Sequence, residues 1–83
     1  MDEALKIRRK VVELFERASL PSLPVEEKKK LLSFVVVGGG PTGVEFSAEL
    51  HDFVHEDLAY LYPELEQYVN ITLLEAGDHI LNM

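Results

Sequence analysis

Cysteine is absent from this sequence. Disulfide bonds, thiolate catalysis and metal sites built on cysteine are therefore excluded. Long apolar runs are absent too: the longest, Phe34 to Val37 with the glycines behind it, is far too short to span a bilayer. The opening residues, MDEALKIRRK, lack the apolar core of a secretory signal, and their acidic start is unlike a mitochondrial presequence. We therefore expect no targeting segment within these residues.

Basic residues are outnumbered by acidic ones, and the formal net charge is −7. A general nucleic-acid binder needs a basic face for the phosphates, so nucleic acid is excluded as a partner. The two basic runs, Arg8 to Lys10 and Lys28 to Lys30, stand beside acidic residues in helical patterns and are interpreted as solvated helix faces. With 83 residues, 47% hydrophobic and 28% charged, the composition is that of one small globular domain.

The first part of the chain, residues 1–32, is predicted to be a helical lead-in segment. Apolar residues at helical spacing predict a helix over residues 3–18. The stretch SLPSLP ends this helix, because proline cannot continue one. A short second helix is expected over residues 25–32, with Ser22 as its N-terminal cap.

The second part, residues 33–83, has the pattern of a strand–helix–strand unit. Ser33 to Val37 is short, apolar and β-branched, which is typical of a strand buried on both faces of a parallel sheet. A long helix is expected over residues 42–61, followed by a turn that Pro63 begins and by a second strand over residues 69–75. The predicted order is thus α-α-β-α-β, an α/β fold with a parallel strand pair.

Three glycines, Gly38, Gly40 and Gly43, fit the pattern G-x-G-x-x-G between the first predicted strand and the long helix. The first permits a tight turn, the second lets a pyrophosphate lie against bare backbone, and the third lets the helix pack on the strand. The helix start directs unpaired N–H groups at the phosphates; Pro41 is tolerable there, and Thr42 can cap the helix or bind a phosphate. These residues predict a partial Rossmann-type dinucleotide-binding fold; the alternative is a glycine turn that serves packing only.

Glu75 ends the second predicted strand, where a dinucleotide fold places the acid that accepts hydrogen bonds from the adenosine ribose. It follows the glycines at more than the usual ~20 residues, because the intervening crossover is long. A carboxylate at this position should repel a 2′-phosphate, so NAD(H) is favoured over NADP(H). The alternative is that Glu75 is simply exposed at a strand end.

The runs FVVVGGGPTGVEFSAELHDFVHEDL and ITLLEAGDHILNM, with the lead-in LPSLPVEEKKKLLSF, resemble the NADH-binding segment of type II NADH dehydrogenases. These are the single-chain alternative NADH:quinone oxidoreductases. The resemblance implies an oxidoreductase at the surface of the mitochondrial inner membrane, a homo-oligomer at full length. It implies that NADH bound by this segment passes hydride to FAD held in another domain, and that the flavin reduces ubiquinone.

The resemblance also implies where the nucleotide lies on this chain. Glu45 would match an acidic residue one turn into the helix, near the nicotinamide end, and Glu75 would select NADH. No catalytic residue is implied. The residues implied to bind the cofactor are Gly38, Gly39, Gly40, Pro41, Thr42, Gly43, Glu45, Glu75, Ala76 and Gly77.

The FAD fingerprint, the quinone site and the membrane-docking segment of the family are not found in this sequence. The resemblance therefore implies a fragment: residues 33–83 would be the first βαβ unit of an incomplete NADH-binding Rossmann domain, behind the lead-in over residues 1–32. We expect that it cannot perform the redox reaction alone. A second class of function stays open, a non-catalytic nucleotide-binding or interaction module that keeps the glycine loop without redox chemistry.

One further motif, HDFVH, places His51 and His55 four residues apart, as in the zinc motif H-E-x-x-H. Asp52 is one methylene shorter than the glutamate of that motif, and no clear third ligand follows. We therefore expect no metal site, and the two histidines are interpreted as surface residues.

Overall fold

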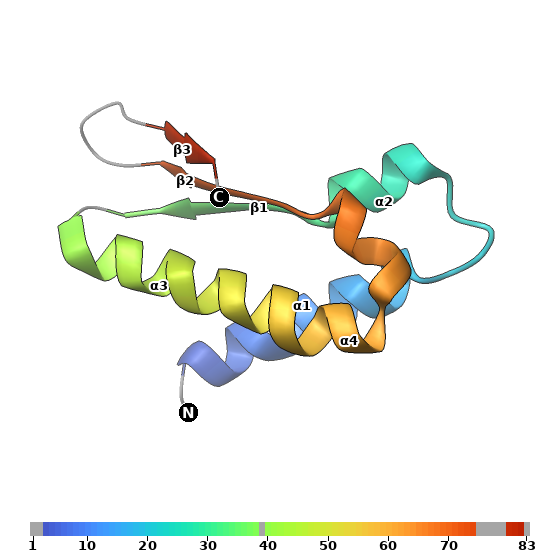
Figure 1. Cartoon of the computed structure of the whole chain (residues 1–83), viewed down its shortest axis with the longest axis horizontal. Coiled ribbons are helices and arrows are strands. Elements are labelled where there is room, and N and C mark those ends of the chain that lie inside the picture. Colours follow the sequence, from blue (N-terminus) through green and yellow to red (C-terminus); the bar gives the residue numbers. More distant parts are fainter. Residues whose placement is uncertain (1–2, 39, 75–79, 83) are drawn as a thin grey trace.

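The computed structural model of the chain describes residues 3–38, 40–74 and 80–82. The predicted order α-α-β-α-β is confirmed, with three further short helices and a third strand (Figure 1). The helical elements are α1 (Glu3–Ala18), α2 (Val25–Leu31), α3 (Gly40–Asp52), the π-helix η1 (Phe53–Leu58), α4 (Ala59–Leu61) and the 3₁₀ helix η2 (Pro63–Tyr68). The strands are β1 (Ser33–Val37), β2 (Asn70–Leu74) and β3 (Ile80–Asn82).

The sheet has the strand order β1-β2-β3. Strands β1 and β2 are parallel, as predicted, and their register aligns Phe34 with Ile71 and Val36 with Leu73. The sequence pattern did not predict β3, which pairs antiparallel with β2. Only residues 75–79 separate these two strands, too few for the crossover that a parallel neighbour needs, so the chain returns in the opposite direction.

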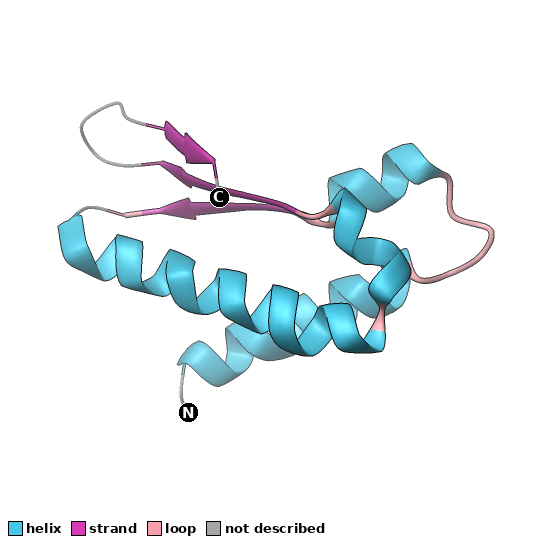
Figure 2. Cartoon of the chain, in the orientation of Figure 1, coloured by secondary structure: helices cyan, strands magenta, loops and turns pink. Residues whose placement is uncertain are grey.

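Helices α1 and α3 lie on one side of the sheet, and within the described part of the chain no helix lies over the other side (Figures 1 and 2). The aromatic ring of Phe15 on α1 stacks on that of Phe34 on β1, with 6.5 Å between centroids, and lies 6.0 Å from the ring of Tyr62. The helices and the sheet thus share one core. Its buried side chains include Val11, Phe15, Ala18, Leu32, Leu50, Val54, Leu58, Leu65 and Ile71.

The prediction that β1 is buried on both faces is wrong for the described residues. Its side chains alternate between exposed and half-buried, and Val35 and Val37 are 62% and 74% exposed. Phe34 and Val36 point toward the helices, while Val35 points to the opposite side. A strand is buried on both faces only when helices cover both, and the two described helices that run along the sheet, α1 and α3, lie on the same side of it (Figure 1).

The junction between α1 and α2 also differs from the expectation. Pro24, not Ser22, precedes the first turn of α2, with φ −61° and ψ 151°, and no side chain caps the helix there. Lys28 does not lie on a purely solvated face: its ammonium donates to the carbonyl oxygens of Ala18 at 2.5 Å and Leu20 at 3.1 Å. A cation at the carboxyl end of α1 satisfies carbonyls that have no intrahelical donor, and it complements the helix dipole.

The long helix expected over residues 42–61 is helical throughout but changes type within its length. It begins at Gly40, becomes the π-helix η1 at Phe53, and ends with α4 at Leu61. Pro63 then opens η2, which agrees with the expected turn.

Candidate functional site

The glycine loop, the segment that carries Gly38, Gly40 and Gly43, connects β1 to α3. The N–H of Gly38 donates to the carbonyl oxygen of Leu74 at 3.2 Å, which continues the pairing of β1 with β2 by one residue. Helix α3 already begins at Gly40. The end of β1, the end of β2 and the first turn of α3 therefore meet at one edge of the sheet, where the carboxyl ends of both parallel strands lie.

The backbones of Gly38 and Gly43 touch. A Cβ atom built on Gly43 would lie 3.4 Å from the carbonyl carbon of Gly38 and 3.6 Å from its Cα, and a Cβ on Gly38 would lie 3.5 Å from the Cα of Gly43. These are van der Waals contacts, so a larger side chain at Gly43 has no room. The structure thus has the close approach of helix and strand that the third glycine of the pattern permits.

Ser47 supports the same contact one turn further along α3. Its side chain is fully buried, and its hydroxyl donates to the carbonyl oxygen of Gly43 at 2.9 Å. The small side chain lets α3 stay close to the sheet, and the hydrogen bond satisfies the buried hydroxyl. The sequence analysis missed Ser47; its spacing of four residues from Gly43, on the same helix face, is the signal that points to it.

The remaining predicted residues of the site divide into three groups. Pro41 and Glu45 are exposed; Glu45 lies two residues after Gly43, about 200° around the helix and away from the sheet. Of Thr42 only the backbone is described, within α3. Gly39, Glu75, Ala76 and Gly77 lie outside the described residues.

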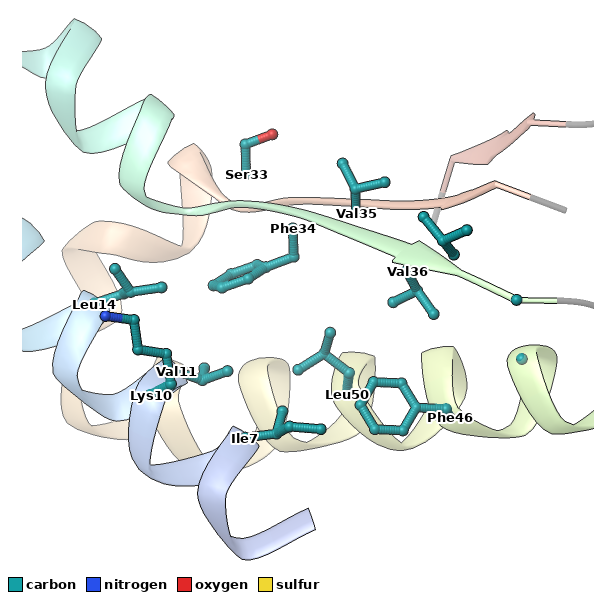
Figure 3. A pocket seen from close by; sticks show the side chains of 13 residues that line it. Ile7, Lys10, Val11, Leu14, Ser33, Phe34, Val35, Val36, Phe46 and Leu50 are labelled. Carbon is teal, nitrogen blue, oxygen red and sulfur yellow. The ribbon is translucent and has the colours of Figure 1, made fainter. Parts of the chain in front are cut away.

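Apart from the glycine loop, a hollow lies between α1, β1 and α3 (Figure 3). This hollow of about 670 Å³ is lined almost entirely by apolar side chains, among them Val11, Phe34, Phe46 and Leu50. Lys10 is the one charged residue on its lining. A pyrophosphate needs several polar donors around it, so the hollow does not suit the phosphates of a nucleotide, and the start of α3 is the better candidate.

The two histidines of HDFVH lie side by side at the far end of α3. Their ring centroids are 4.3 Å apart, and the Nδ1 atom of His55 lies 3.2 Å from a carboxylate oxygen of Glu66 on η2. Over residues 3–38, 40–74 and 80–82, no group of three or more His, Cys, Asp or Glu side chains could hold a metal ion. Within the same ranges, no helix is both long and apolar enough to cross a bilayer.

Comparison with known proteins gives one family and several close relatives. Residues 2–83 match the family model described as pyridine nucleotide-disulphide oxidoreductase. The chain is 67% identical over 82 residues to the external alternative NAD(P)H-ubiquinone oxidoreductase B4, mitochondrial, of Arabidopsis thaliana, a match that covers 99% of this chain and 14% of that protein. It is 49% identical over 85 residues to the external NADH-ubiquinone oxidoreductase 2, mitochondrial, of Saccharomyces cerevisiae, covering 100% of this chain and 15% of that protein.

Among solved structures, the chain is similar to NDH2 from Plasmodium falciparum in complex with NADH. The TM-score is 0.79 and the identity 44%, over 84% of this chain and 14% of the NDH2 chain. The chain therefore spans only about 14% of the length of these relatives.

Proposed function

Because this chain belongs to the pyridine nucleotide-disulphide oxidoreductase family, we propose that it is the NADH-binding segment of a flavin-dependent NADH:ubiquinone oxidoreductase. The observation that carries the proposal is the contact between Gly38 and Gly43, which seats the first turn of α3 against the end of β1. Relatives named NAD(P)H-ubiquinone oxidoreductases and a neighbour in complex with NADH support it. Residues 1–32 are then the helical lead-in, and residues 33–83 the first βαβ unit of the NADH-binding domain.

The start of α3 fits the pyrophosphate of a dinucleotide. The first N–H groups of a helix have no intrahelical acceptor, and the positive end of the helix dipole favours an anion there. Glycines at Gly38 and Gly40 leave the backbone uncovered by side chains, so the phosphates can approach it closely. An acidic chain can therefore hold an anionic ligand without a basic patch.

We assign the nucleotide contacts to two segments of the chain. The glycine loop holds the pyrophosphate, Glu45 approaches the nicotinamide end, and Glu75 accepts hydrogen bonds from the adenosine ribose and so selects NADH. The full set is Gly38, Gly39, Gly40, Pro41, Thr42, Gly43, Glu45, Glu75, Ala76 and Gly77.

The chemistry belongs to the cofactors and not to side chains of this segment. NADH held by this segment would supply the hydride, and an FAD held by another domain would supply the redox chemistry toward ubiquinone. This chain contributes binding and orientation: the helix start fixes the pyrophosphate, and Glu75 fixes the adenosine half. Since the relatives are named mitochondrial, we place the whole enzyme in the mitochondrion. Its place at the inner-membrane surface and its homo-oligomeric state are proposed from the resemblance alone.

Titration of the chain with NADH, followed by nicotinamide fluorescence, tests the proposal. We expect one NADH per chain, with ADP-ribose as a competitor, since the pyrophosphate is the main contact. Gly40→Val should weaken binding at least tenfold, because its side chain covers the backbone on which the pyrophosphate lies. Ala48→Val, on the exposed side of α3, is the matched control and should bind as the wild type does. Unchanged binding by Gly40→Val, or no binding by the wild type, would contradict the proposal.

A further inference from the structure

His51 and His55 form a close pair of imidazoles on one face of the helix. His51 lies near the end of α3, and His55 lies in the π-helix η1. Their ring centroids are 4.3 Å apart with an angle of 44° between the ring planes. The side chains are 39% and 30% exposed, so an ion in solvent can reach both rings.

Of the two rings, that of His55 has a carboxylate within hydrogen-bond distance of its δ nitrogen, and that of His51 has one somewhat farther away. The Nδ1 atom of His55 lies 3.2 Å from the Oε2 atom of Glu66, and that of His51 lies 3.7 Å from the Oδ1 atom of Asp52. A carboxylate next to Nδ1 favours the tautomer that carries the proton on that nitrogen. In that tautomer of His55 the lone pair is on Nε2, which is the arrangement of metal-binding histidines, whose other N–H typically donates to a carboxylate.

We propose that the Nε2 atoms of His51 and His55 form a binding site for one divalent transition-metal ion of the class that prefers imidazole, such as Zn²⁺ or Cu²⁺. Two nitrogens at about 2.0–2.1 Å from one ion lie roughly 3 Å apart. The ring centroids are 4.3 Å apart, so the two imidazoles are near enough to each other to share one ion. The described residues add no third direct ligand, so the other coordination positions hold water or an outside ligand. No metal site is predicted from HDFVH because no clear third ligand follows it; Glu66 lies on another element, and its contact with His55 appears only in the fold.

Such an ion would join three elements. His51 belongs to α3, His55 to η1, and Glu66 reaches His55 from η2. An ion that binds this arrangement and not the unfolded chain stabilises it by mass action. The metal would therefore hold the carboxyl-terminal end of α3 and the adjoining η1 in place. The inference does not depend on NADH binding.

Copper titration of the 83-residue chain, followed by electron paramagnetic resonance, tests the site directly. The chain has no cysteine and three histidines, so the only other imidazole is that of His79. We expect one Cu²⁺ per chain with two nitrogen ligands from His51 and His55. His51→Gln and His55→Gln should each weaken binding at least tenfold, and His79→Gln should not. Glu66→Gln should weaken it roughly tenfold or more, as other changes to the partners of metal-bound histidines do.

Two further readouts separate metal binding from a merely structural role of the pair. Zn²⁺ should raise the thermal midpoint of the wild type and of His79→Gln, measured by far-UV circular dichroism, but not that of His51→Gln. Binding should also be lost in acid, since a protonated imidazole cannot bind metal. Equal copper affinity in the wild type and His51→Gln, or loss of the site in His79→Gln alone, would overturn the proposal.

Discussion

At the scale of single residues, the glycine at position 43 is the most constrained feature of the site. Its backbone touches that of Gly38, and the nearest atom to an added Cβ would lie at 3.4 Å. The spacing of the glycines predicted this contact, because a glycine at the third position lets the helix pack closely on the strand. The four-residue spacing of Ser47 from Gly43 places both on one face of α3, but the role of Ser47 becomes clear only once the approach of that face to the sheet is known.

Substitution of Gly43 tests the contact by the size of the new side chain. Gly43→Ala should stay within about 1 kcal/mol of the wild type, because the gain in helix propensity offsets a tight contact. Gly43→Val should lose about 1–3 kcal/mol in the free energy of unfolding, since its extra carbons must displace the backbone of Gly38. Urea denaturation measures both. Ala48→Val controls for the propensity of valine and should lose only about 0.5 kcal/mol; equal losses at positions 43 and 48 would show that the contact is unimportant.

At the scale of elements, the carboxyl end of α1 depends on a side chain from α2. The ammonium of Lys28 donates to Ala18 and Leu20, whereas Lys29 and Lys30 only form exposed pairs with Glu26 and Glu27. The three lysines are adjacent and chemically identical, so composition alone could not single out Lys28. Its role arises from the turn over residues 19–24, which brings α2 back toward the end of α1.

Lys28→Met removes the ammonium and keeps most of the apolar stem. We expect a loss of about 1–2 kcal/mol in the free energy of unfolding, because carbonyls near the end of α1 lose a charged donor. Lys29→Met is the matched control and should change the stability by less than about 0.5 kcal/mol, as its ion pair is exposed. Thermal and urea unfolding of the two variants gives the comparison, and a larger loss for Lys29→Met would refute the capping role.

The change from α3 to the π-helix η1 also belongs to this scale. Leu50, Val54 and Leu58 are all buried and follow one another at intervals of four residues. In an α-helix such a row drifts by about 40° at each step, whereas the wider π turn drifts the other way. Because the α-helix α3 is followed by the π-helix η1, the two drifts offset each other, and the three buried side chains stay on one face. The sequence showed the row but not the helix type, since both types share the apolar pattern.

At the scale of the whole molecule, the α/β class and the parallel strand pair were predicted correctly, and the resemblance to type II NADH dehydrogenases is confirmed by the relatives. The prediction that β1 is buried on both faces was wrong. A uniformly apolar strand indicates helices on both faces of its sheet. The described helices cover only one face of the sheet, so some apolar side chains of β1 stay exposed. Strand β1 is an edge strand of the sheet, and it lies beside the apolar hollow.

Because helices cover only one face of the sheet, we expect substitutions of neighbouring valines of β1 to differ in their effect on stability. Val37→Thr should cost less than about 0.5 kcal/mol, because Val37 is 74% exposed and its hydroxyl-bearing replacement stays in water. Val36→Thr should cost about 1 kcal/mol, since its half-buried side chain faces the helices (Figure 3) and the new hydroxyl is partly removed from water. Both variants replace valine by threonine. The difference between their free energies of unfolding, measured by urea denaturation, therefore reports the effect of the face on which the side chain lies. Equal costs would mean that the open face is covered in solution.

The central claim is that this chain binds NADH and that Glu75 makes the choice of nucleotide. Titration of the wild type and Glu75→Ser with NADH and NADPH by isothermal calorimetry tests it most directly. We expect the wild type to prefer NADH by at least about tenfold, or about 1.4 kcal/mol, because a carboxylate repels the 2′-phosphate. Glu75→Ser should lose most of that preference, and Glu64→Ser, an exposed acid on η2, should keep it. Equal affinity of the wild type for the two nucleotides would contradict the account.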